Sequence, residues 1–563
     1  MKYRDKLPKI IEREYGAALD LTLWPGSLRD PPGTFPSNRI MHYKQVTGAA
    51  SQPPTEAANN PVTARSTTRL YLENIFKKNR AHRQSTLVNA ILRGRQVTRR
   101  NYLKCPGMRT CLQEGNKPIL SASNSFQGRS REKSLRKNVI ADLLVITAAS
   151  MIPGWASATN GINLLGPGAE SASMAGADLA VAKDTAAINS NPAGLSQLEG
   201  SRFDQYVLSA HSTNVKHNDL FGNDAHNQLD PQWAAASSYG QPIENTPLTF
   251  GIGLFAQGGL GFAYDDLLNA FGTRDDLKAV LGGSKLAPAI AWQVTPKLSV
   301  GMAIGLVYST LEQEIFPDTS FVDAMNPSRN FFGYHLKDID GIHFGAKMGL
   351  QYQFNDRVTL GMAYTTATSM DMHGGRLEVD FSGLGLGKVS YRDAELNGLN
   401  FPEEFGVGLA IQATDQLLVS VEANWINWSD AMSSATLKAR KPDNPMAPPS
   451  LTIPTTFDWR DQYVIALGVE YDVNERLSLR AGYNYGRNPV PDEHLTPLLA
   501  LIGEHHFAVG AAYSLTGGWE LQGAVHIEPK TSVTYTNPNV PLGPGAKETR
   551  EGYFLHFSVA REW

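Results

Sequence analysis

The chain has 563 residues, 42% of them hydrophobic, and a formal net charge of −3. This charge is divided unevenly, since residues 1–158 carry 26 Lys and Arg against 10 Asp and Glu, whereas residues 159–563 carry 25 against 44. Both cysteines, Cys105 and Cys111, fall in the basic part, which excludes a disulfide framework and a thiolate metal site from the acidic part.

Residues 1–134 are basic, rich in Pro and Arg, and show no sustained periodicity. This composition predicts an extension that is disordered or that results from a start codon assigned too far upstream. The string Arg93-Gly94-Arg95 has the composition of a nucleic-acid patch, but the plainer interpretation is preferred and no nucleic-acid partner is expected.

Residues 135–158 have the pattern of a secretory signal peptide. A basic stretch, Arg129–Lys137, precedes the apolar run Val139–Pro153, and Ala156-Ser157-Ala158 supplies a small-x-small cleavage site. The apolar run is short for a membrane-spanning helix and Asp142 interrupts it. We therefore expect cleavage after Ala158.

Residues 159–200 are small and polar, with many glycines and alanines and few large apolar side chains. Such a segment cannot bury a hydrophobic core of its own. We expect another part of the chain to enclose it.

From residue 201 to Trp563, apolar and polar residues alternate with the period of a β-strand. Leu477, Leu479 and Tyr483 share one face of such a segment, for example, and Ser478 and Arg480 share the other. Fourteen segments follow this pattern, near 202–211, 232–241, 247–258, 284–294, 297–313, 341–354, 357–371, 400–412, 416–428, 460–471, 476–487, 504–515, 518–529 and 551–563. Short turns and long loops alternate between them, which is typical of outer-membrane proteins. Residues 201–563 are thus predicted to form an all-β, 14-stranded antiparallel transmembrane β-barrel, which fits better than a soluble sandwich or propeller.

The predicted inward-facing residues are small and mostly uncharged, as at Ser299, Gly301 and Ala303. Such a lumen leaves room for an internal plug or an apolar ligand, whereas a general diffusion porin needs a charged, water-filled lumen. Small residues could also merely permit a tightly coiled barrel.

A few inward positions carry charge. Arg480 and Lys347 are candidates for seating a ligand head group, because a cation in a dry lumen attracts a carboxylate strongly. The alternative, given equal weight, is pairing with Glu422, Glu470 or Glu520 to hold the plug or the barrel.

The segment Glu170–Leu195, which contains Asn191-Pro192-Ala193-Gly194, resembles the N-terminal hatch of the FadL/TodX outer-membrane transporters. Leu399–Glu403, Asn427–Asp430 and Leu479–Pro491 are similar to strand ends and loops of the same family. The resemblance covers residues 159–563. It implies a monomeric barrel in the outer membrane of a Gram-negative bacterium, with residues 159–200 as a hatch inside the lumen.

The resemblance also implies passive uptake of hydrophobic compounds, which extracellular loops capture, an internal pocket holds and a lateral gap releases beside a kinked third strand. That strand corresponds to Leu248–Phe262, and Gly258, Gly259 and Gly261 are the candidate kink, since glycine tolerates unusual dihedrals; a plain hairpin end is the alternative. Apolar side chains of the long loops are expected to be exposed so that they can capture the hydrophobic compound. They are Leu267, Leu268, Phe271, Phe316, Phe321, Phe331, Phe332, Met446 and Leu498–Ile502.

The cargo is expected to be long-chain fatty acids, which Arg480 and Lys347 favour slightly, or aromatic hydrocarbons. A general diffusion porin is the rival function. No enzyme activity, cofactor or metal is expected, because the chain has no Gly-x-Ser-x-Gly elbow and no His-Glu-x-x-His pair. His505 and His506 are adjacent on a predicted strand, so their side chains point to opposite faces.

Overall fold

The computed structural model describes residues 160–563. The extension predicted for residues 1–134 and the signal peptide predicted for residues 135–158 lie outside the described residues. Between residues 160 and 563, no helix is long and apolar enough to span a membrane.

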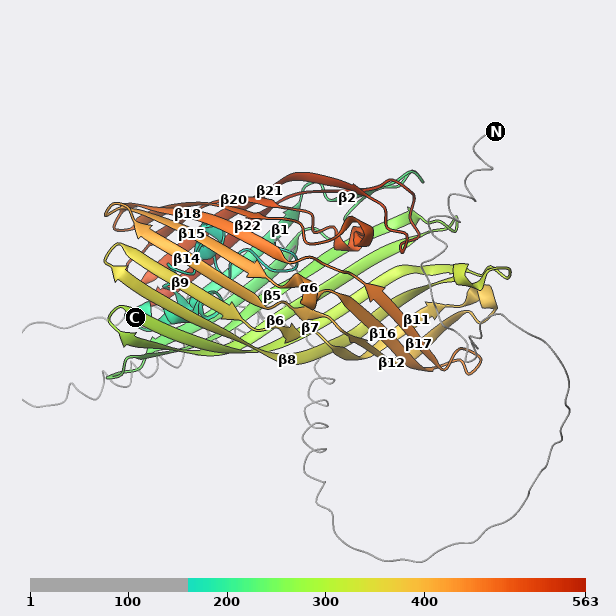
Figure 1. The fold of residues 1–563 in the computed structure, drawn as a ribbon, viewed down its shortest axis with the longest axis horizontal. Helices are drawn as coiled ribbons and strands as arrows, with labels where there is room; N and C mark the ends of the chain where they lie inside the picture. The colour runs from blue at the N-terminus through green and yellow to red at the C-terminus, as the bar shows by residue number, and fades with distance from the viewer. Residues whose placement is uncertain (1–159) are drawn as a thin grey trace, which may run out of the picture. The chain divides into compact units, whose positions relative to one another are not determined.

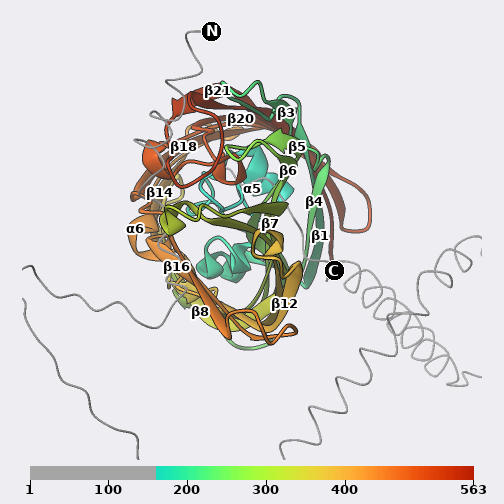
Figure 2. The ribbon, with the colours of Figure 1, turned by 90° about the vertical axis from the view of Figure 1, so that its right-hand side faces the viewer.

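Fourteen antiparallel strands form a closed barrel, as predicted (Figures 1 and 2). The sheet closes because the first strand pairs along its whole length with the last, from Arg202 opposite Glu562 to Ser212 opposite Gly552. Around the barrel the strands are β1 (Arg202–Ser212), β4 (Gln232–Pro242), β5 (Leu248–Leu268), β6 (Arg274–Thr295), β7 (Leu298–Phe321), β8 (Phe331–Asn355), β9 (Val358–Thr365), β14 (Glu404–Gln412), β15 (Leu417–Ile426), β18 (Gln462–Asn474), β19 (Leu477–Gly486), β20 (His505–Ser514), β21 (Trp519–Tyr535) and β22 (Ala546–Glu562).

Further elements belong to the long-loop end of the barrel, which the topology of outer-membrane barrels assigns to the extracellular side. They are β2 (Lys216–Asn218), β3 (Asp224–His226), η3 (Pro327–Arg329), β10 (Thr368–Ser369), β11 (Met372–Asp380), η4 (Ser382–Leu384), β12 (Lys388–Asn397), β13 (Asn400–Phe401), α6 (Trp428–Ala431), β16 (Ser434–Pro442), β17 (Ser450–Thr456), η5 (Asp492–His494) and η6 (Pro497–Leu499).

Several strands are longer than the sequence predicted. Residues 265–283 and 316–341 lie between the predicted strand segments, where long loops are expected. They are largely strand, because β5 to β8 continue as a tall sheet with 21 to 25 residues each. Above the membrane the outer face of this sheet meets water, so the lipid-facing apolar residues that reveal a transmembrane strand are missing there.

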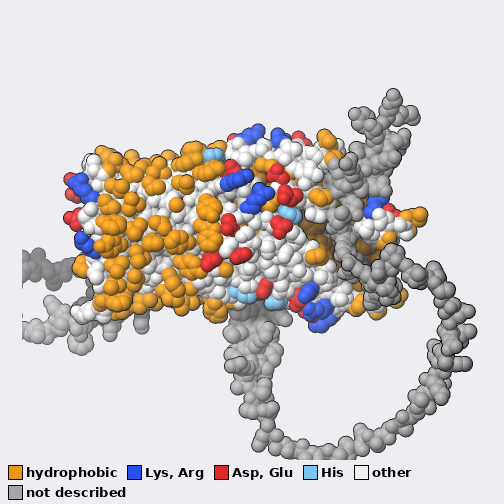
Figure 3. Space-filling model, in the orientation of Figure 1, with side chains coloured by type: hydrophobic (Ala, Val, Ile, Leu, Met, Phe, Trp, Pro, Cys, Tyr) orange, Lys and Arg blue, Asp and Glu red, His pale blue; other side chains and the backbone are white. Residues whose placement is uncertain are grey.

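On the face that Figure 3 shows, apolar side chains form a band over one half of the barrel, and charged side chains gather beyond it. Exposed side chains such as Leu479, Val509 and Phe557 alternate with buried inward ones such as Arg480 and Ser558. Aromatic residues, among them Trp292, Tyr308, Tyr471, Tyr513 and Trp519, are exposed on the outer face. This band matches the lipid-facing belt of an outer-membrane barrel.

The predicted hatch lies inside the barrel (Figure 2), where α5 (Ala169–Ser173), η1 (Thr185–Ile188) and η2 (Pro192–Gln197) pack against the wall. The small inward residues make this possible. A Cβ atom added to Gly301 would lie 2.3 Å from the carbonyl carbon of Pro192, and one added to Gly361 would lie 2.1 Å from the carbonyl oxygen of Leu179. The small lumen face therefore accommodates the hatch.

Candidate functional site

An apolar cavity of about 470 Å³ lies at the extracellular end of the barrel. Leu260 of β5, Leu277 and Leu281 of β6 and Phe332 of β8 line one side of it, and β16 and β17 contribute Leu437 and Leu451 to the other. Its few polar lining residues are Gln313, Tyr334, Thr455, Thr456, His494, Thr496, Asn537 and Asn539. A concave, mostly apolar site of this size suits a hydrophobic small molecule.

Most of the apolar loop side chains that were expected to be exposed are buried. Phe316, Phe331 and Leu498 are at most 5% exposed, whereas Met446 is 78% exposed. Phe331, Phe332, Leu498 and Leu499 line the cavity. The expectation that these side chains stand exposed is wrong for most of them, because strands and loops at this end fold over one another and bury apolar surface.

Strand β5 separates from β4 partway up the wall. The β4–β5 ladder runs from Pro242 opposite Thr249 to Ser237 opposite Leu254 and then stops, while the β5–β6 ladder continues past a bulge between Ala256 and Gly258. Gly258 has a φ of 156°, a conformation that L side chains rarely adopt. The distortion coincides with the glycines of the expected kink and leaves a stretch of β5 without a ladder partner in β4.

The first residues of the hatch lie against this kink. The N–H of Gly259 donates to the carbonyl oxygen of Ile162 at 3.0 Å, and Asn163 forms an isolated bridge with Gly258. Closer to the extracellular end, the side-chain amide of Gln232 in β4 donates to the carbonyl oxygen of Gly261 at 2.9 Å. The side chain of Asn227 also bonds this stretch of β5, since its oxygen accepts from the N–H of Ala263 at 2.9 Å. The hatch and residues just before and at the start of β4 thus contact β5 where the β4–β5 ladder is interrupted.

The Asn191-Pro192-Ala193-Gly194 motif fixes the hatch to the wall. Asn191 is fully buried; its amide donates to the carbonyl oxygens of Leu179 at 2.7 Å and of Leu350 in β8 at 3.1 Å. Its side-chain oxygen accepts from the N–H of Ala193 at 3.2 Å, which caps η2. The motif therefore joins two parts of the hatch to one strand of the barrel.

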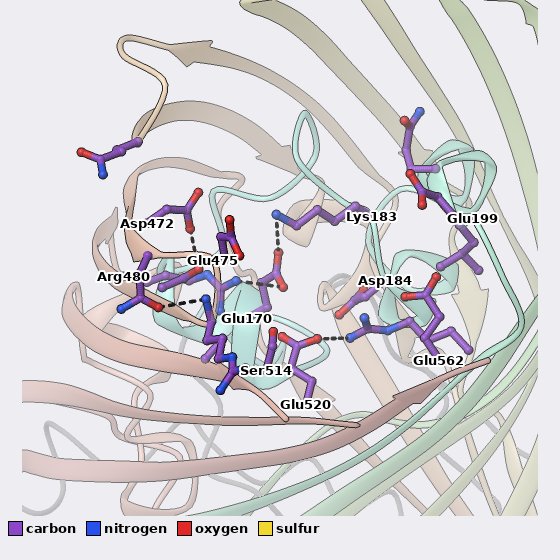
Figure 4. Close-up of a pocket in the computed structure, with 18 residues that line it drawn as sticks. Glu170, Lys183, Asp184, Glu199, Asp472, Glu475, Arg480, Ser514, Glu520 and Glu562 are labelled. Carbon is purple, nitrogen blue, oxygen red and sulfur yellow. Dashed lines mark hydrogen bonds and ion pairs between the residues drawn. The ribbon is translucent and has the colours of Figure 1, made fainter. Parts of the chain in front are cut away.

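A charged vestibule of about 680 Å³ lies on the other side of the hatch, toward the short turns (Figure 4). Arg480 is 6% exposed there; its guanidinium donates to Glu470 of β18 and lies 3.1 Å from Glu170 of the hatch. The Lys183 ammonium lies 3.3 Å from Glu470. These contacts support the pairing alternative for Arg480, since both of its partners are protein carboxylates.

Lys347 is half-buried on the inward face of β8 and lines two small cavities between the hatch and the wall. It lies three residues from Leu350, whose carbonyl oxygen Asn191 contacts, toward the extracellular end of β8. The structure thus separates the two head-group candidates: Lys347 lines the cavities beside the β5 kink, and Arg480 lines the vestibule.

One group of side chains on the outer wall has the composition of a metal site. Ligand atoms of Glu312, Glu314 and His335 lie within 4.8 Å of one another. The Lys278 ammonium already lies 2.8 Å from Glu312 and 3.8 Å from Glu314. Because the Lys278 ammonium lies between the two carboxylates, we interpret this group as an ion-pair cluster and not as a metal site.

The family model for outer membrane protein transport proteins (OMPP1/FadL/TodX) matches residues 150–546. The chain belongs to this family. It is an outer-membrane protein, as the sequence predicted. Outer membrane protein P1 of Haemophilus influenzae is 26% identical over 301 residues, which cover 48% of this chain and 61% of P1. The 47 kDa outer membrane protein of Pasteurella multocida is 26% identical over 223 residues, which cover 38% of this chain and 50% of the relative.

The chain thus matches between half and three fifths of the length of these curated relatives. Solved structures share its fold at low identity. The Pseudomonas putida toluene transporter TodX has a TM-score of 0.59 at 20% identity, and a Pseudomonas aeruginosa FadL homologue has a TM-score of 0.56 at 16% identity. Each comparison covers 71% of this chain and 99% of the other.

Sequence reasoning missed several buried charges of the barrel strands, among them Asp204, Lys285, Glu528 and Arg550. Lys285 of β6 is 7% exposed and lines the same small cavity as Lys347. The alternation of the segment 284–294 places Lys285 on the same face as Ala287 and Ala289, and this signal was sufficient to find it.

Proposed function

We propose that the protein takes up hydrophobic compounds passively across the outer membrane as a monomer embedded in outer-membrane lipid. The observation that carries this proposal is the apolar cavity at the extracellular end. Leu260 and Leu281 line it, and Gly258 and Gly283 follow only two residues further along the same two strands. The cavity therefore extends toward the kink of β5, where the β4–β5 ladder is interrupted.

We propose that cargo leaves sideways through this interruption, with Gly258, Gly259 and Gly261 forming the gate. Two observations support a lateral exit. The hatch fills the lumen below the kink, and its underside is lined with ion pairs such as Arg480–Glu170. Apolar cargo would have to displace desolvated charges to pass through the hatch, which is costly.

Among possible cargoes, we propose long-chain fatty acids, with Lys347 rather than Arg480 as the head-group residue. Aromatic hydrocarbons are the alternative, since the same apolar cavity would accept them. The mature protein in this proposal is residues 159–563, with the hatch at 159–200, the barrel at 201–563 and residues 135–158 removed as a signal peptide.

The proposal is tested by uptake in a Gram-negative strain that lacks its own carrier. Expression of the protein should restore uptake of oleate well above the empty-vector rate, and purified protein should give no steady ion conductance in planar bilayers. A general diffusion porin would show the reverse: large conductance and trimers, without selective uptake of oleate. That result would overturn the proposal.

A further inference from the structure

We propose that the outer surface of β8, β11, β12 and β16 binds the phosphate groups of a phosphorylated glycolipid in the outer leaflet of the membrane. The surface is defined by four cations, Lys337 of β8, Arg376 of β11, Arg392 of β12 and Lys438 of β16, and is called the cationic face below. The inference goes beyond the proposed uptake function, because it concerns the outside of the protein and not its lumen.

The four strands form one sheet with two chemically different faces. β11 pairs with β8 and with β12, and β12 pairs with β16 (Figure 1). The face toward the lumen is apolar, and Leu336, Leu377 and Leu437 on it are at most 4% exposed. Three of the four cations are direct sequence neighbours of these leucines, so the alternation of a strand turns them outward. All four cations are exposed or half-buried.

The cations lie side by side across this sheet. Lys337 and Arg376 are directly opposite each other in the β8–β11 ladder. Their Cβ atoms are therefore about 5 Å apart. On the other side of β11, a register shift in the ladder with β12 places Arg376 opposite Arg392 and Asp393. Like charges that face each other destabilise a sheet, so an anion that bridges them would stabilise this one.

The acidic residues beside these cations have other partners. Asp393 lies 3.0 Å from the Lys441 ammonium, and Glu395 pairs with the guanidinium of Arg440. Within residues 160–563, no carboxylate lies within ion-pair distance of any of the four cations of the cationic face. Their charge is therefore left to attract an external anion.

The cationic face lies just above the lipid-facing band, where charged side chains replace apolar ones (Figure 3). On β8, Ile342 and Phe344 are 57% and 74% exposed and belong to the band. Lys337 precedes Ile342 by five residues, with Asp340 between them. Five residues span about 17 Å along a strand, which for a tilted strand is on the order of 10 Å along the membrane normal. Sugar phosphates of an outer-leaflet glycolipid lie at this height, and clustered Lys and Arg at a membrane surface attract anionic lipid head groups.

Binding of lipid A to the purified protein in neutral detergent, measured by native mass spectrometry, tests the proposal. Lipid A with two phosphates should bind at least tenfold more tightly than the same lipid with both phosphates removed. In the triple variant Lys337→Gln, Arg376→Gln, Arg392→Gln this ratio should fall toward one. Binding of palmitate should not change in the variant, because the three side chains point away from the lumen, so this test is separate from that of the uptake function.

The matched control is Arg460→Gln, Arg487→Gln, Lys530→Gln, which removes three exposed cations near β18, β19 and β21, across the barrel from β8 and β12 (Figure 2). This variant should keep the ratio. Equal binding of the two forms of lipid A to the wild type would overturn the proposal, whether or not the triple variant folds. An equal loss in the control would show a general attraction to the charged rim and overturn the cationic face as a site. Displacement of lipid A by inorganic phosphate at equal concentration would show a site for free phosphate and overturn the lipid as its partner.

Discussion

The two sides of the hatch differ in chemistry. Toward the extracellular side, the lumen widens into an apolar cavity lined by residues such as Leu277 and Phe332. Toward the periplasmic side, a vestibule of similar scale is lined by Glu170, Lys183 and Arg480. The free energy of a hydrophobic molecule falls when it enters the apolar cavity and rises when it enters the charged vestibule. This difference supports the proposal that an apolar cargo leaves at the kink between them.

The largest effect is expected from closing the kink. Gly258→Val places a Cβ where the carbonyl oxygen of Ile162 lies 2.3 Å away, at a φ that a β-branched residue avoids. Uptake of oleate should fall at least tenfold while the barrel remains folded, as judged by heat-modifiable migration on gels. The control is Gly523→Val, where the nearest atom to an added Cβ is 3.8 Å away. Normal uptake in a folded Gly258→Val protein would refute the gate.

A smaller effect is expected from making the apolar cavity polar. Leu277 is 1% exposed and lines the cavity, so Leu277→Asn should weaken binding of palmitate by roughly tenfold to a hundredfold, which corresponds to about 1.5–3 kcal/mol for a buried apolar side chain. Met446→Asn changes an apolar side chain that is 78% exposed outside the cavity and should have little effect. If Met446→Asn weakened binding as much as Leu277→Asn, capture would depend on exposed loops instead of the buried cavity.

On the charged side of the hatch, a change in stability is expected rather than a change in selectivity. Arg480→Ala leaves Glu170 and Glu470 without their main partner, and removing one member of a buried ion pair costs about 3–5 kcal/mol. The melting temperature of the barrel should fall, and the folded protein should still bind palmitate as tightly as the wild type. Loss of palmitate binding in a folded Arg480→Ala protein would return Arg480 to the head-group role.

The smallest effect concerns pH and the extracellular loops. Burial opposes the charge of His217, but hydrogen bonds to Asp219 and Glu548 outweigh it and raise the pKa of His217 to about 9. A raised folded-state pKa stabilises the fold fully below the unfolded value near 6.5, and this stabilisation is lost as the pH rises through 9. The protection factors of the amides at residues 216–218 and 547–549, which correct for the intrinsic acceleration of exchange by hydroxide, should therefore fall between pH 7 and pH 10, and His217→Gln should remove this fall.

The barrel itself could be predicted from the sequence because lipid imposes a strict alternation on every transmembrane strand. Leu479 and Arg480 illustrate this, since one is exposed to the outside and the other is buried in the lumen, as predicted. The extracellular parts of β5 to β8 could not be predicted in the same way, because water on one face and packed loops on the other remove the apolar–polar contrast.

The site was predictable only in part. Alternation identifies Lys347 and Arg480 as inward, but it does not show that the hatch separates them, which decides that Arg480 pairs with Glu170. Nor does it show whether an inward lysine has a partner. Lys183 of the hatch, for example, lies 3.3 Å from Glu470 of β18. Pairing across the lumen depends on residues hundreds of positions apart and requires the structure.

The central claim, that cargo leaves sideways and not through the hatch, is tested most directly by locking the hatch to the wall. The hydroxyl oxygens of Ser196 in η2 and Ser299 in β7 lie 2.7 Å apart, so Ser196→Cys with Ser299→Cys should form a disulfide. Residues 160–163 at the kink remain free to move in this variant. We predict the same rate of oleate uptake in the oxidised and reduced protein. A large loss on oxidation that a reductant restores would contradict the lateral route.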